Sequence, residues 1–518
     1  MGNFTVRRAV LSGVVTASTL AAALLAPAHA GSPATRPTGP AATTSPAGAA
    51  APGIYMVWGN STDAAQPWVR GGQVKVEWRD IEPARGSFNW APLAAGLATY
   101  ANLGKSTTIQ VNADTKPAWV WNLVAKCGTS KGWDIPQYWD PIYLTLEQEM
   151  ITSLKNYLAT APNTDRITLV RANADAIGTE LTDVPTGYRC TPTPDGHVYN
   201  VVWDKTVART WYQKIMGAWL NTLSPTFHVA LRVQTFTTNN PPPPLDWLGV
   251  DKAWIMGTAS DIDPNPSREN FDIFSMNWAR TGRTVAYWEH QRADGVKTNL
   301  VSWNYWRLLL ELQKGVTYPA VYGNVLRYAN TNPEFRAAFD FTNRYAGFHN
   351  SPATAPGAWV ALRQGTGVRA GNFGWFITQL NPDTTSTALD SNSGASMIGN
   401  PTQRFGRFAR RIDGGTTKDT MFFQLNPAFR SSIAIPTGLT ELHVRYLDKG
   451  IGSFVVNYGA GLSGVVAKTD TGDWKDAVID VPGAAFTGSL PGGSDVTVQA
   501  LGTESTVFHM VELVVKSR

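Results

Sequence analysis

Hydrophobic residues follow two different periods along the first two thirds of the chain. Eight short runs rich in β-branched and apolar residues have the length of strands, and stretches with a helical repeat of apolar positions separate them. Strands that alternate with helices in this way favour a parallel sheet. The runs occupy residues 53–58, 73–78, 107–112, 167–173, 228–235, 252–257, 283–288 and 318–323.

Four of the intervening stretches carry clear helix signals. Asp140-Pro141 is an N-cap residue followed by proline at the first helical position, and apolar residues then recur every four positions from Ile142 to Leu158. Similar patterns predict helices from Val207 to Ser224, over 298–314 and over about 333–346. Eight strand–helix units in about 300 residues fit a closed (β/α)₈ barrel. An open doubly wound sheet is the alternative, and it is disfavoured because no glycine-rich phosphate loop follows the first strand.

The pattern changes around residues 351–372, where proline and glycine interrupt the helical repeat. Short strand-like runs with Gly, Pro and Asp between them then continue to Arg518, a spacing typical of an antiparallel sandwich. They lie at 419–424, 441–447, 452–458, 463–468, 476–481, 495–500 and 507–516. We therefore expect a (β/α)₈ TIM barrel over residues 53–355, followed by an all-β, jelly-roll-like sandwich over 356–518.

The N-terminal 30 residues have the features of an export signal. Arg7 and Arg8 precede an apolar run from Ala9 to Leu25, and Ala28-His29-Ala30 is a cleavage pattern of small residues. The alternative, a membrane anchor, is disfavoured because the run is too short and too rich in small residues for a full span. Residues 31–52 are rich in Pro, Ala, Thr and Ser and form a flexible linker. The sequence thus predicts a secreted, extracellular protein with no membrane partner after cleavage.

Composition excludes several classes of protein. Hydrophobic residues make up 43% of the chain and charged residues 16%, which is incompatible with overall disorder. A net charge of +5 on 518 residues, with no basic run, disfavours a partner that is a nucleic acid. The two cysteines, Cys127 and Cys190, are too few for a disulfide scaffold. Both fall in predicted surface loops, so we favour a single disulfide between them over two free thiols.

Two glutamates follow strands on opposite sides of the predicted barrel. The fourth strand leads to Thr179-Glu180, and the seventh leads to Trp288-Glu289-His290. Active sites of such barrels lie at the carboxyl ends of the strands. A pair of carboxyl groups there fits glycosidic bond cleavage, in which one protonates the leaving oxygen and the other attacks the anomeric carbon or activates water. In a retaining enzyme the two groups are about 5–5.5 Å apart.

The segment from Glu77 to Trp90 carries a resemblance to a known group of enzymes. Trp78, Ile81-Glu82-Pro83, Gly86, Phe88 and Trp90 match a W-x-x-I-E-P-x-x-G-x-F-x-W stretch after the second strand. This chain therefore resembles the clan A retaining glycoside hydrolases, family 42 in particular. The resemblance covers about residues 53–350 and implies that Glu180 is the acid/base and Glu289 the nucleophile. The clan usually has asparagine directly before the acid/base, and this chain has Thr179 there.

Polar and aromatic residues at the ends of the strands are candidates for substrate binding. Tryptophan faces suit sugar rings, and the chain has 20 tryptophans. Arg79 would orient the nucleophile and lower its pKa. Glu77 is a reserve candidate for either catalytic role, with an ion pair to Lys75 or Arg79 as the alternative. No residues have metal-ligand spacing, so no metal or other cofactor is expected. The candidates are Trp58, Glu77, Trp78, Arg79, Asn112, Asp114, Trp119, Thr179, Trp288, His290, Tyr322 and Asn324.

Residues 444–450 and 474–476 resemble sandwich domains attached to secreted glycosidases, which bind glycan or brace the barrel. The sequence as a whole predicts a secreted retaining glycoside hydrolase that acts on an extracellular polysaccharide or oligosaccharide. Two alternatives stay open at this point. One is a noncatalytic glycan-binding protein on a degenerate barrel, and the other is a transglycosylase that uses the same residues. The oligomeric state is unknown from the sequence.

Overall fold

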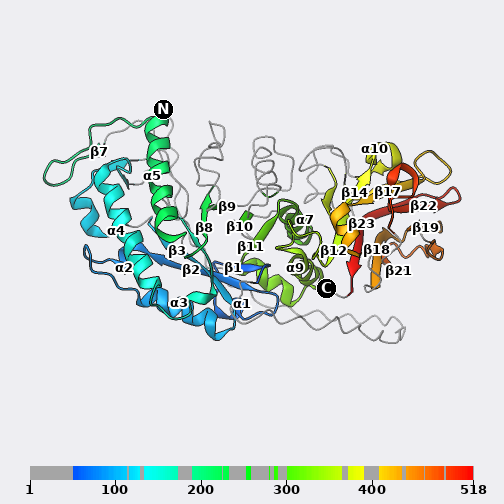
Figure 1. The fold of residues 1–518 in the computed structure, drawn as a ribbon, viewed down its shortest axis with the longest axis horizontal. Coiled ribbons are helices and arrows are strands. Elements are labelled where there is room, and N and C mark those ends of the chain that lie inside the picture. The colour runs from blue at the N-terminus through cyan, green and yellow to red at the C-terminus, as the bar shows by residue number, and fades with distance from the viewer. Residues whose placement is uncertain are drawn as a thin grey trace, which may run out of the picture. The chain divides into compact units, whose positions relative to one another are not determined.

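A closed barrel of eight parallel strands forms the N-terminal part of the molecule (Figure 1). The computed structural model describes residues 51–113, 116–128, 134–172, 190–224, 226–232, 253–257, 279, 285–289, 300–363, 371–389, 408–433, 439–459, 461–482, 486–516 and 518. The strands neighbour one another in the order β1-β11-β10-β9-β8-β6-β3-β2, and β2 closes the ring onto β1. Closure confirms the barrel and rules out the open sheet. The strands are β1 (Tyr55–Val57), β2 (Gly71–Glu77), β3 (Ser106–Asn112), β6 (Ile167–Arg171), β8 (Val229–Arg232), β9 (Ala253–Gly257), β10 (Val285–Glu289) and β11 (Val316–Tyr322).

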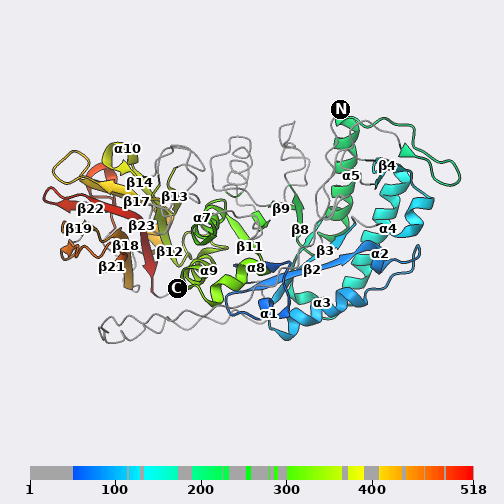
Figure 2. The same ribbon diagram turned by 180° about the vertical axis from the view of Figure 1, so that it is seen from behind.

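Helices cover the outside of the barrel (Figures 1 and 2). Helix α3 packs on β2 and β3, α5 on β8, and α7 on β11. Asp140 caps α4 by accepting a hydrogen bond from the Ile142 N–H, as its sequence predicts. The longer helices are α3 (Ala91–Asn102), α4 (Pro141–Leu158), α5 (Lys205–Leu223), α7 (Leu300–Gln313) and α9 (Pro333–Tyr345). Short α-helical turns are α1 (Ser61–Ala64), α2 (Trp78–Ile81) and α8 (Gly323–Leu326), and 3₁₀ turns are η1 (Ala118–Asn122), η2 (Thr164–Arg166) and η6 (Arg327–Asn330).

A small antiparallel sheet in the order β5-β4-β7 joins the segments that follow β3 and β6. It consists of β4 (Lys126–Gly128), β5 (Asp134–Pro136) and β7 (Cys190–Thr191). Cys127 and Cys190 are directly paired in the β4–β7 ladder and form a disulfide across it. The bridge ties together two segments that are 63 residues apart in the sequence.

Two antiparallel sheets make up the C-terminal part, in agreement with the predicted absence of a helical repeat there. Both sheets contribute side chains to one buried apolar cluster, which includes Val360, Phe423, Phe454 and Leu513. The seven-stranded sheet contains β12 (Gly357–Ala361), β13 (Phe373–Trp375), β15 (Thr387–Ala388), β16 (Arg410–Ile412), β18 (Leu439–Leu447), β21 (Trp474–Pro482) and β23 (Thr506–Val515). The five-stranded sheet contains β14 (Ile377–Leu380), β17 (Thr420–Leu425), β19 (Ser453–Asn457), β20 (Val466–Ala467) and β22 (Val496–Leu501). Short helical turns are α10 (Pro382–Thr385), α11 (Pro427–Ile433) and η10 (Pro491–Gly493).

An aromatic cluster joins two barrel helices to the seven-stranded sheet. Trp306 of α7 packs edge-on against Phe373 and Phe408, and Tyr345 of α9 packs near Trp359 of β12. The Tyr345 hydroxyl also donates a 2.8 Å hydrogen bond to the buried Glu512 carboxylate of β23. The described helices include none with the length and apolar character needed to cross a membrane.

Candidate functional site

The carboxyl ends of the barrel strands bring several of the candidate residues together. Glu77 ends β2, Asn112 ends β3 and Tyr322 ends β11, while Trp58 directly follows β1. The ladders pair Glu77 with Asn112 and Val57 with Tyr322, so these ends lie at one level of the barrel. We call this set of strand ends the barrel mouth.

Glu77 is held at the mouth by partners on both of its carboxylate oxygens. Asn112 donates a 2.9 Å hydrogen bond from Nδ2 to Oε2, and the Lys75 ammonium lies 2.7 Å from Oε1. Each of the two ion-paired side chains keeps about a fifth of its surface exposed, at 23% for Lys75 and 21% for Glu77. The ion pair expected with Lys75 or Arg79 therefore forms with Lys75. Two fixed partners orient the carboxylate, which suits a residue that positions a ligand hydroxyl.

Trp58 presents a large aromatic side chain at the same mouth. It is 47% exposed, and its backbone has a φ of 51°, in the left-handed region that bulky residues rarely adopt. The Lys75 ammonium lies 4.3 Å from the indole centroid, which is a cation–π distance. Backbone strain of this kind persists where surrounding contacts impose it and is frequent at functional sites. An exposed indole beside fixed polar groups is well suited to stack on a sugar ring.

Lys75 was missed as a site residue at the sequence level, although a signal for it existed. Residues two apart on a strand point to the same side, so Gln73, Lys75 and Glu77 share one face of β2. On β3 the matching positions carry Gln110 and Asn112, and Gln73 donates a 2.6 Å hydrogen bond to Gln110. This polar face differs from the apolar cluster that five other strands contribute, with members Tyr55, Val57, Leu169, Ala230, Ala286, Tyr318 and Ala320. The barrel is therefore polar on this face of β2 and β3, next to the apolar cluster that the five other strands contribute.

Glu289 is the last residue of β10, where the ladder pairs it with Ala320 of β11. In chain order β10 is the seventh strand of the barrel and β6 is the fourth. Trp288 also belongs to β10, and its ladder partner is Pro319. Four further residues predicted for the site lie outside the described residues: Asp114, Thr179, Glu180 and His290.

Two expected substrate contacts have other roles in the structure. Trp78 is fully buried in α2 within the outer core, and its indole N–H donates a 2.7 Å hydrogen bond to Oε2 of Glu82. The Arg79 side chain is 54% exposed and pairs with its neighbour Asp80 at 3.4 Å. The expectation that Trp78 binds substrate is therefore wrong, because an indole with no exposed surface cannot stack on a ligand. Arg79 is thus a surface cation among the described residues, and its role toward the nucleophile stays a prediction.

Glu82 organises the motif that carries the family resemblance. Besides the Trp78 indole, its carboxylate accepts a 2.8 Å hydrogen bond from the Gly86 N–H, and its carbonyl accepts one of 3.0 Å from the indole of Trp119. Burial raises the pKa of Glu82. The indole N–H of Trp119 is thus committed to the fold, while its ring stays partly exposed. The motif is therefore structural in its contacts, and its flanking Glu77 reaches the mouth.

Asn324 lies close to the mouth on α8. Its neighbour Gly323 approaches Gly59 and the Asp63 carboxylate so closely that a side chain there would collide with both. The Asn324 Oδ1 atom is buried and has no hydrogen-bond partner within the described part of the structure. It is therefore an acceptor that a ligand hydroxyl can satisfy.

A second buried carboxyl lies in the segment after β3. Glu147 of α4 accepts a 3.1 Å hydrogen bond from the Tyr143 hydroxyl, and burial raises its pKa to about 8 although the nearby Lys116 opposes that shift. Glu147 is 1% exposed and Lys116 is 6% exposed. Within the ranges that the structure describes, no three His, Cys, Asp or Glu side chains are grouped as metal ligands.

Comparison with known proteins gives weak similarities. No protein-family model matches the sequence, and no curated protein matches it. The catalytic domain of a β-amylase from Paenibacillus polymyxa is 10% identical, with a TM-score of 0.39 over 57% of this chain and 98% of that one. A glucosidase from Croceicoccus marinus is 9% identical, with a TM-score of 0.35 over 89% and 95%. A glycoside hydrolase family 30 subfamily 8 xylanase from Clostridium acetobutylicum is 11% identical, with a TM-score of 0.36 over 89% and 96%. Because these TM-scores are below 0.5, the barrel assignment rests on the strand order alone.

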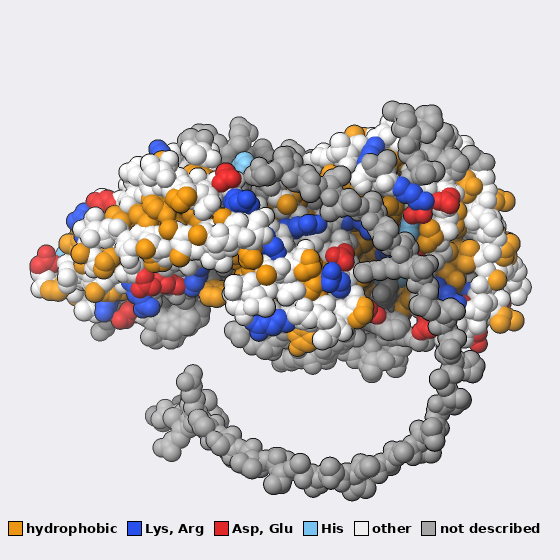
Figure 3. Space-filling view, turned by 90° about the horizontal axis from the view of Figure 1, so that it is seen from below, with side chains coloured by type: hydrophobic (Ala, Val, Ile, Leu, Met, Phe, Trp, Pro, Cys, Tyr) orange, Lys and Arg blue, Asp and Glu red, His pale blue; other side chains and the backbone are white. Residues whose placement is uncertain are grey.

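Charged side chains of both signs are mixed on one face of the molecule. On the face drawn in Figure 3, the described basic and acidic side chains are interspersed, and they form no continuous band of Lys and Arg. The polar groups at the mouth are likewise mixed, because Lys75 is neutralised by Glu77.

Proposed function

We propose that this chain is a secreted retaining glycoside hydrolase that cleaves a polysaccharide or oligosaccharide outside the cell. The observation that carries the proposal is the position of Glu289 at the carboxyl end of the seventh barrel strand. The same mouth presents Trp58 and Glu77, which suit a sugar ring and its hydroxyls, and the buried Asn112 orients Glu77. Residues 1–30 would direct export, and the C-terminal sheets would form a glycan-binding or bracing sandwich.

The proposed reaction has two steps. The Glu289 carboxylate attacks the anomeric carbon while the bond from that carbon to the leaving oxygen breaks, and Glu180 donates its proton to this oxygen. A covalent glycosyl ester on Glu289 results. Glu180 then removes a proton from water, which attacks the anomeric carbon and releases the Glu289 carboxylate. The configuration of the sugar is retained because it inverts twice.

Trapping the ester is the direct test of this proposal. The purified chain is first screened on a panel of neutral polysaccharides, and a 2-deoxy-2-fluoro aryl glycoside of the sugar that is released is then added. We expect stoichiometric labelling, with the mass increase on the peptide that contains Glu289. Labelling of a different carboxylate, or inversion of configuration in the released product, would contradict the proposal.

A pair of variants separates chemistry from folding. Glu289→Gln should reduce kcat at least 1000-fold because it removes the nucleophile. The matched control is Glu149→Gln, a surface carboxylate that pairs with Arg85 at 2.8 Å, and it should keep wild-type kcat. Glu289→Gln activity within tenfold of wild type would refute the assignment.

A further inference from the structure

The connection that follows β1 forms a tight turn directly after Trp58. Asn60 caps α1, because its side chain accepts a 2.9 Å hydrogen bond from the Asp63 N–H while its own N–H donates a 3.2 Å bond to Oδ2 of Asp63. Gly59 lies between Trp58 and this cap, and a Cβ there would lie 2.3 Å from the sulfur of Met56. The chain is therefore closely held on the C-terminal side of Trp58.

Arg327, at the end of α8, binds the aspartate of this turn through both carboxylate oxygens. Its Nε donates a 2.8 Å hydrogen bond to Oδ1 of Asp63, and its Nη2 donates one of 2.8 Å to Oδ2. The Asp63 side chain is 5% exposed. Burial raises the pKa of Asp63, but the bonds from Arg327 and Asn60 outweigh burial and hold this pKa below its usual value. The pair is therefore ionised at neutral pH, and its two parallel bonds fix distance and direction.

The ion pair joins two connections that leave neighbouring strands side by side. Strands β1 and β11 are paired, and α8 begins directly after β11. A Cβ on Gly323 would lie 2.6 Å from the Cα of Gly59 and 2.8 Å from Oδ2 of Asp63, so the two backbones touch next to the pair. Asn324 precedes Arg327 by three residues, which is about one helical turn. A shift of the Asp63–Arg327 pair would therefore move both Trp58 and Asn324.

Trp58 and Asn324 both need support from outside their own side chains. The backbone of Trp58 has a φ of 51°, a conformation that persists only where the surroundings impose it. Since Trp58 is 47% exposed, packing of its indole gives limited support. The buried Oδ1 of Asn324 has no hydrogen-bond partner among the described residues, so no such bond fixes this end of the amide. The connections joined by Asp63 and Arg327 supply the support that both residues need.

We propose that Asp63 and Arg327 are a positioning pair, which fixes the Trp58 indole and the Asn324 amide for contact with a sugar ring at the barrel mouth. The pair acts through the turn at Gly59 on one side and through α8 on the other, without touching the substrate. The identity of the ligand rests on the proposed function. The ordering of Trp58 by the pair does not, because it exists in the free protein.

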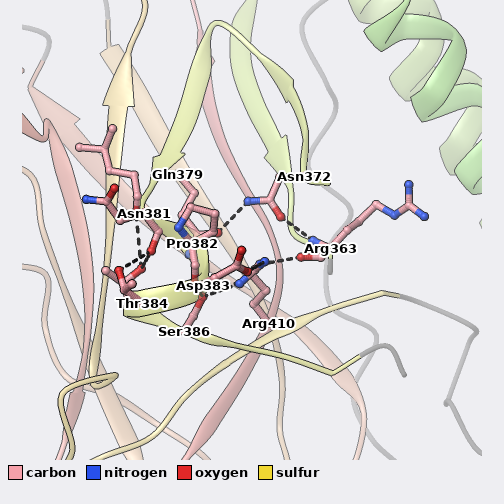
Figure 4. Close-up of polar contacts among 11 residues, drawn as sticks. Arg363, Asn372, Gln379, Asn381, Pro382, Asp383, Thr384, Ser386 and Arg410 are labelled. Atoms are coloured by element: carbon pink, nitrogen blue, oxygen red, sulfur yellow. Dashed lines mark hydrogen bonds and ion pairs between the residues drawn. The ribbon is translucent and has the colours of Figure 1, made fainter. Parts of the chain in front are cut away.

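A second aspartate–arginine pair provides a matched comparison in the C-terminal part of the molecule (Figure 4). Asp383 belongs to the turn α10, which Asn381 precedes as N-cap residue, and accepts a 2.7 Å hydrogen bond from the fully buried Arg410. Arg410 also donates to the Pro382 carbonyl at 2.8 Å and to the Arg363 carbonyl at 2.6 Å. Like α1, α10 has four residues, an asparagine before it and an aspartate bound to an arginine, but it belongs to the C-terminal sheets.

Fluorine NMR of the full chain, labelled with 5-fluorotryptophan, measures the order of Trp58 without any substrate. The signal of Trp58 is assigned by its loss in Trp58→Phe, and the other tryptophan signals report whether a variant is folded. We expect Arg327→Ala and Asp63→Asn to shift and broaden the Trp58 signal. Arg327→Lys keeps the charge but not the paired bonds and should have an intermediate effect. Asp383→Asn is the matched control and should leave the signal unchanged. An unchanged Trp58 signal in Arg327→Ala would overturn the proposal.

Steady-state kinetics separate a positioning role from a structural one. The probe is whichever of 4-nitrophenyl β-cellobioside, β-xylobioside and β-mannobioside is hydrolysed fastest. Arg327→Ala should raise KM about 3- to 10-fold with a smaller change in kcat, because the pair positions binding groups and not the nucleophile. The double variant Asp63→Asn, Arg327→Ala should have the same KM as Arg327→Ala, since the pair acts as a unit. A loss of folded protein alone would lower the apparent kcat at constant KM.

Arg85→Ala is the matched control for the arginine. Arg85 binds both carboxylate oxygens of Glu149, and its 49% exposed side chain resembles that of Arg327, at 54%. This variant should keep the wild-type KM. Equal KM values for Arg327→Ala and Arg85→Ala would refute the positioning role.

Failure of this pair and failure of the proposed function give different results. If no fluoro glycoside labels Glu289 and no aryl glycoside is hydrolysed, the proposed function fails. The fluorine signal of Trp58 then still decides whether Arg327 fixes the indole. If Glu289 is labelled but neither the Trp58 signal nor KM responds to Arg327→Ala, the positioning role alone fails.

Discussion

Replacing the buried Glu147 by glutamine should stabilise the protein at neutral pH. Burial raises the pKa of this carboxyl from 4.5 to about 8, so the folded protein keeps it neutral while the unfolded chain ionises it. Between these two values the folded state binds more protons, and the free energy of unfolding therefore falls as the pH rises. With one pKa unit equal to about 1.4 kcal/mol, the loss at pH 7 relative to pH 4 is about 3 kcal/mol. Glutamine cannot ionise, and its amide oxygen can still accept the Tyr143 hydrogen bond.

The assay is urea unfolding of wild type and Glu147→Gln, followed by tryptophan fluorescence at several pH values between 4 and 8. The two proteins should have similar stability near pH 4.5, and the variant should gain steadily up to about 3 kcal/mol at pH 7. Taking the difference between the two proteins cancels the titrating groups that do not interact with Glu147. A difference between wild type and Glu147→Gln that is constant over this pH range would refute the reasoning.

Four further predictions can be tested directly. The double variant Cys127→Ser, Cys190→Ser should lose about 4 kcal/mol of unfolding free energy, which is the loop entropy for a separation of 63 residues. Its melting temperature should no longer respond to reductant. A melting temperature equal to that of the wild type would show that the bridge does not constrain the chain. Tyr345→Phe removes the hydrogen bond to buried Glu512 and should cost about 1–3 kcal/mol in urea unfolding, while Tyr328→Phe on the surface should cost nothing measurable. Trp58→Ala should raise KM for the substrate about tenfold with a smaller change in kcat. If the variant and the wild type have equal KM values, Trp58 does not contact the substrate. The exported protein should begin at Gly31 when its N terminus is sequenced, and retention of residues 1–30 would contradict the signal assignment.

The strands of the barrel could be located from the sequence because each is a short run of β-branched and apolar residues. All eight predicted runs overlap the observed strands, and the helix capped by Asp140 begins at Pro141 as expected. Helix α3 was missed because its Ala-rich sequence has weak periodicity and includes Gly96. A Cβ at Gly96 would lie 2.3 Å from a methyl group of Val74, so this glycine serves the packing of α3 on β2. Tertiary contact, not local propensity, decides this helix.

At the candidate site, sequence reasoning worked for positions at strand ends and failed for side chains that turn away from them. Glu77 and Asn112 end neighbouring strands and meet, as the barrel topology requires. Trp78 is one residue further along and enters a helical turn, which directs its indole into the outer core. Strands β12 to β16 were missed because several of them are only two or three residues long and lie among glycine and proline. Two of them, β12 and β16, pair with β23, a partner distant in the sequence, which no local pattern reveals.

The aromatic cluster between α7, α9 and the seven-stranded sheet limits how the gene for this protein can be rearranged. Trp306 and Trp359 are both fully buried by side chains from opposite sides of the boundary near residue 355. A truncation or recombination breakpoint at that boundary would uncover several large indole and phenyl rings on each product. Exposed apolar patches of this kind cause aggregation. The C-terminal sheets therefore cannot be exchanged alone for those of another protein. A functional chimera must also exchange the surfaces of α7 and α9 that face these sheets.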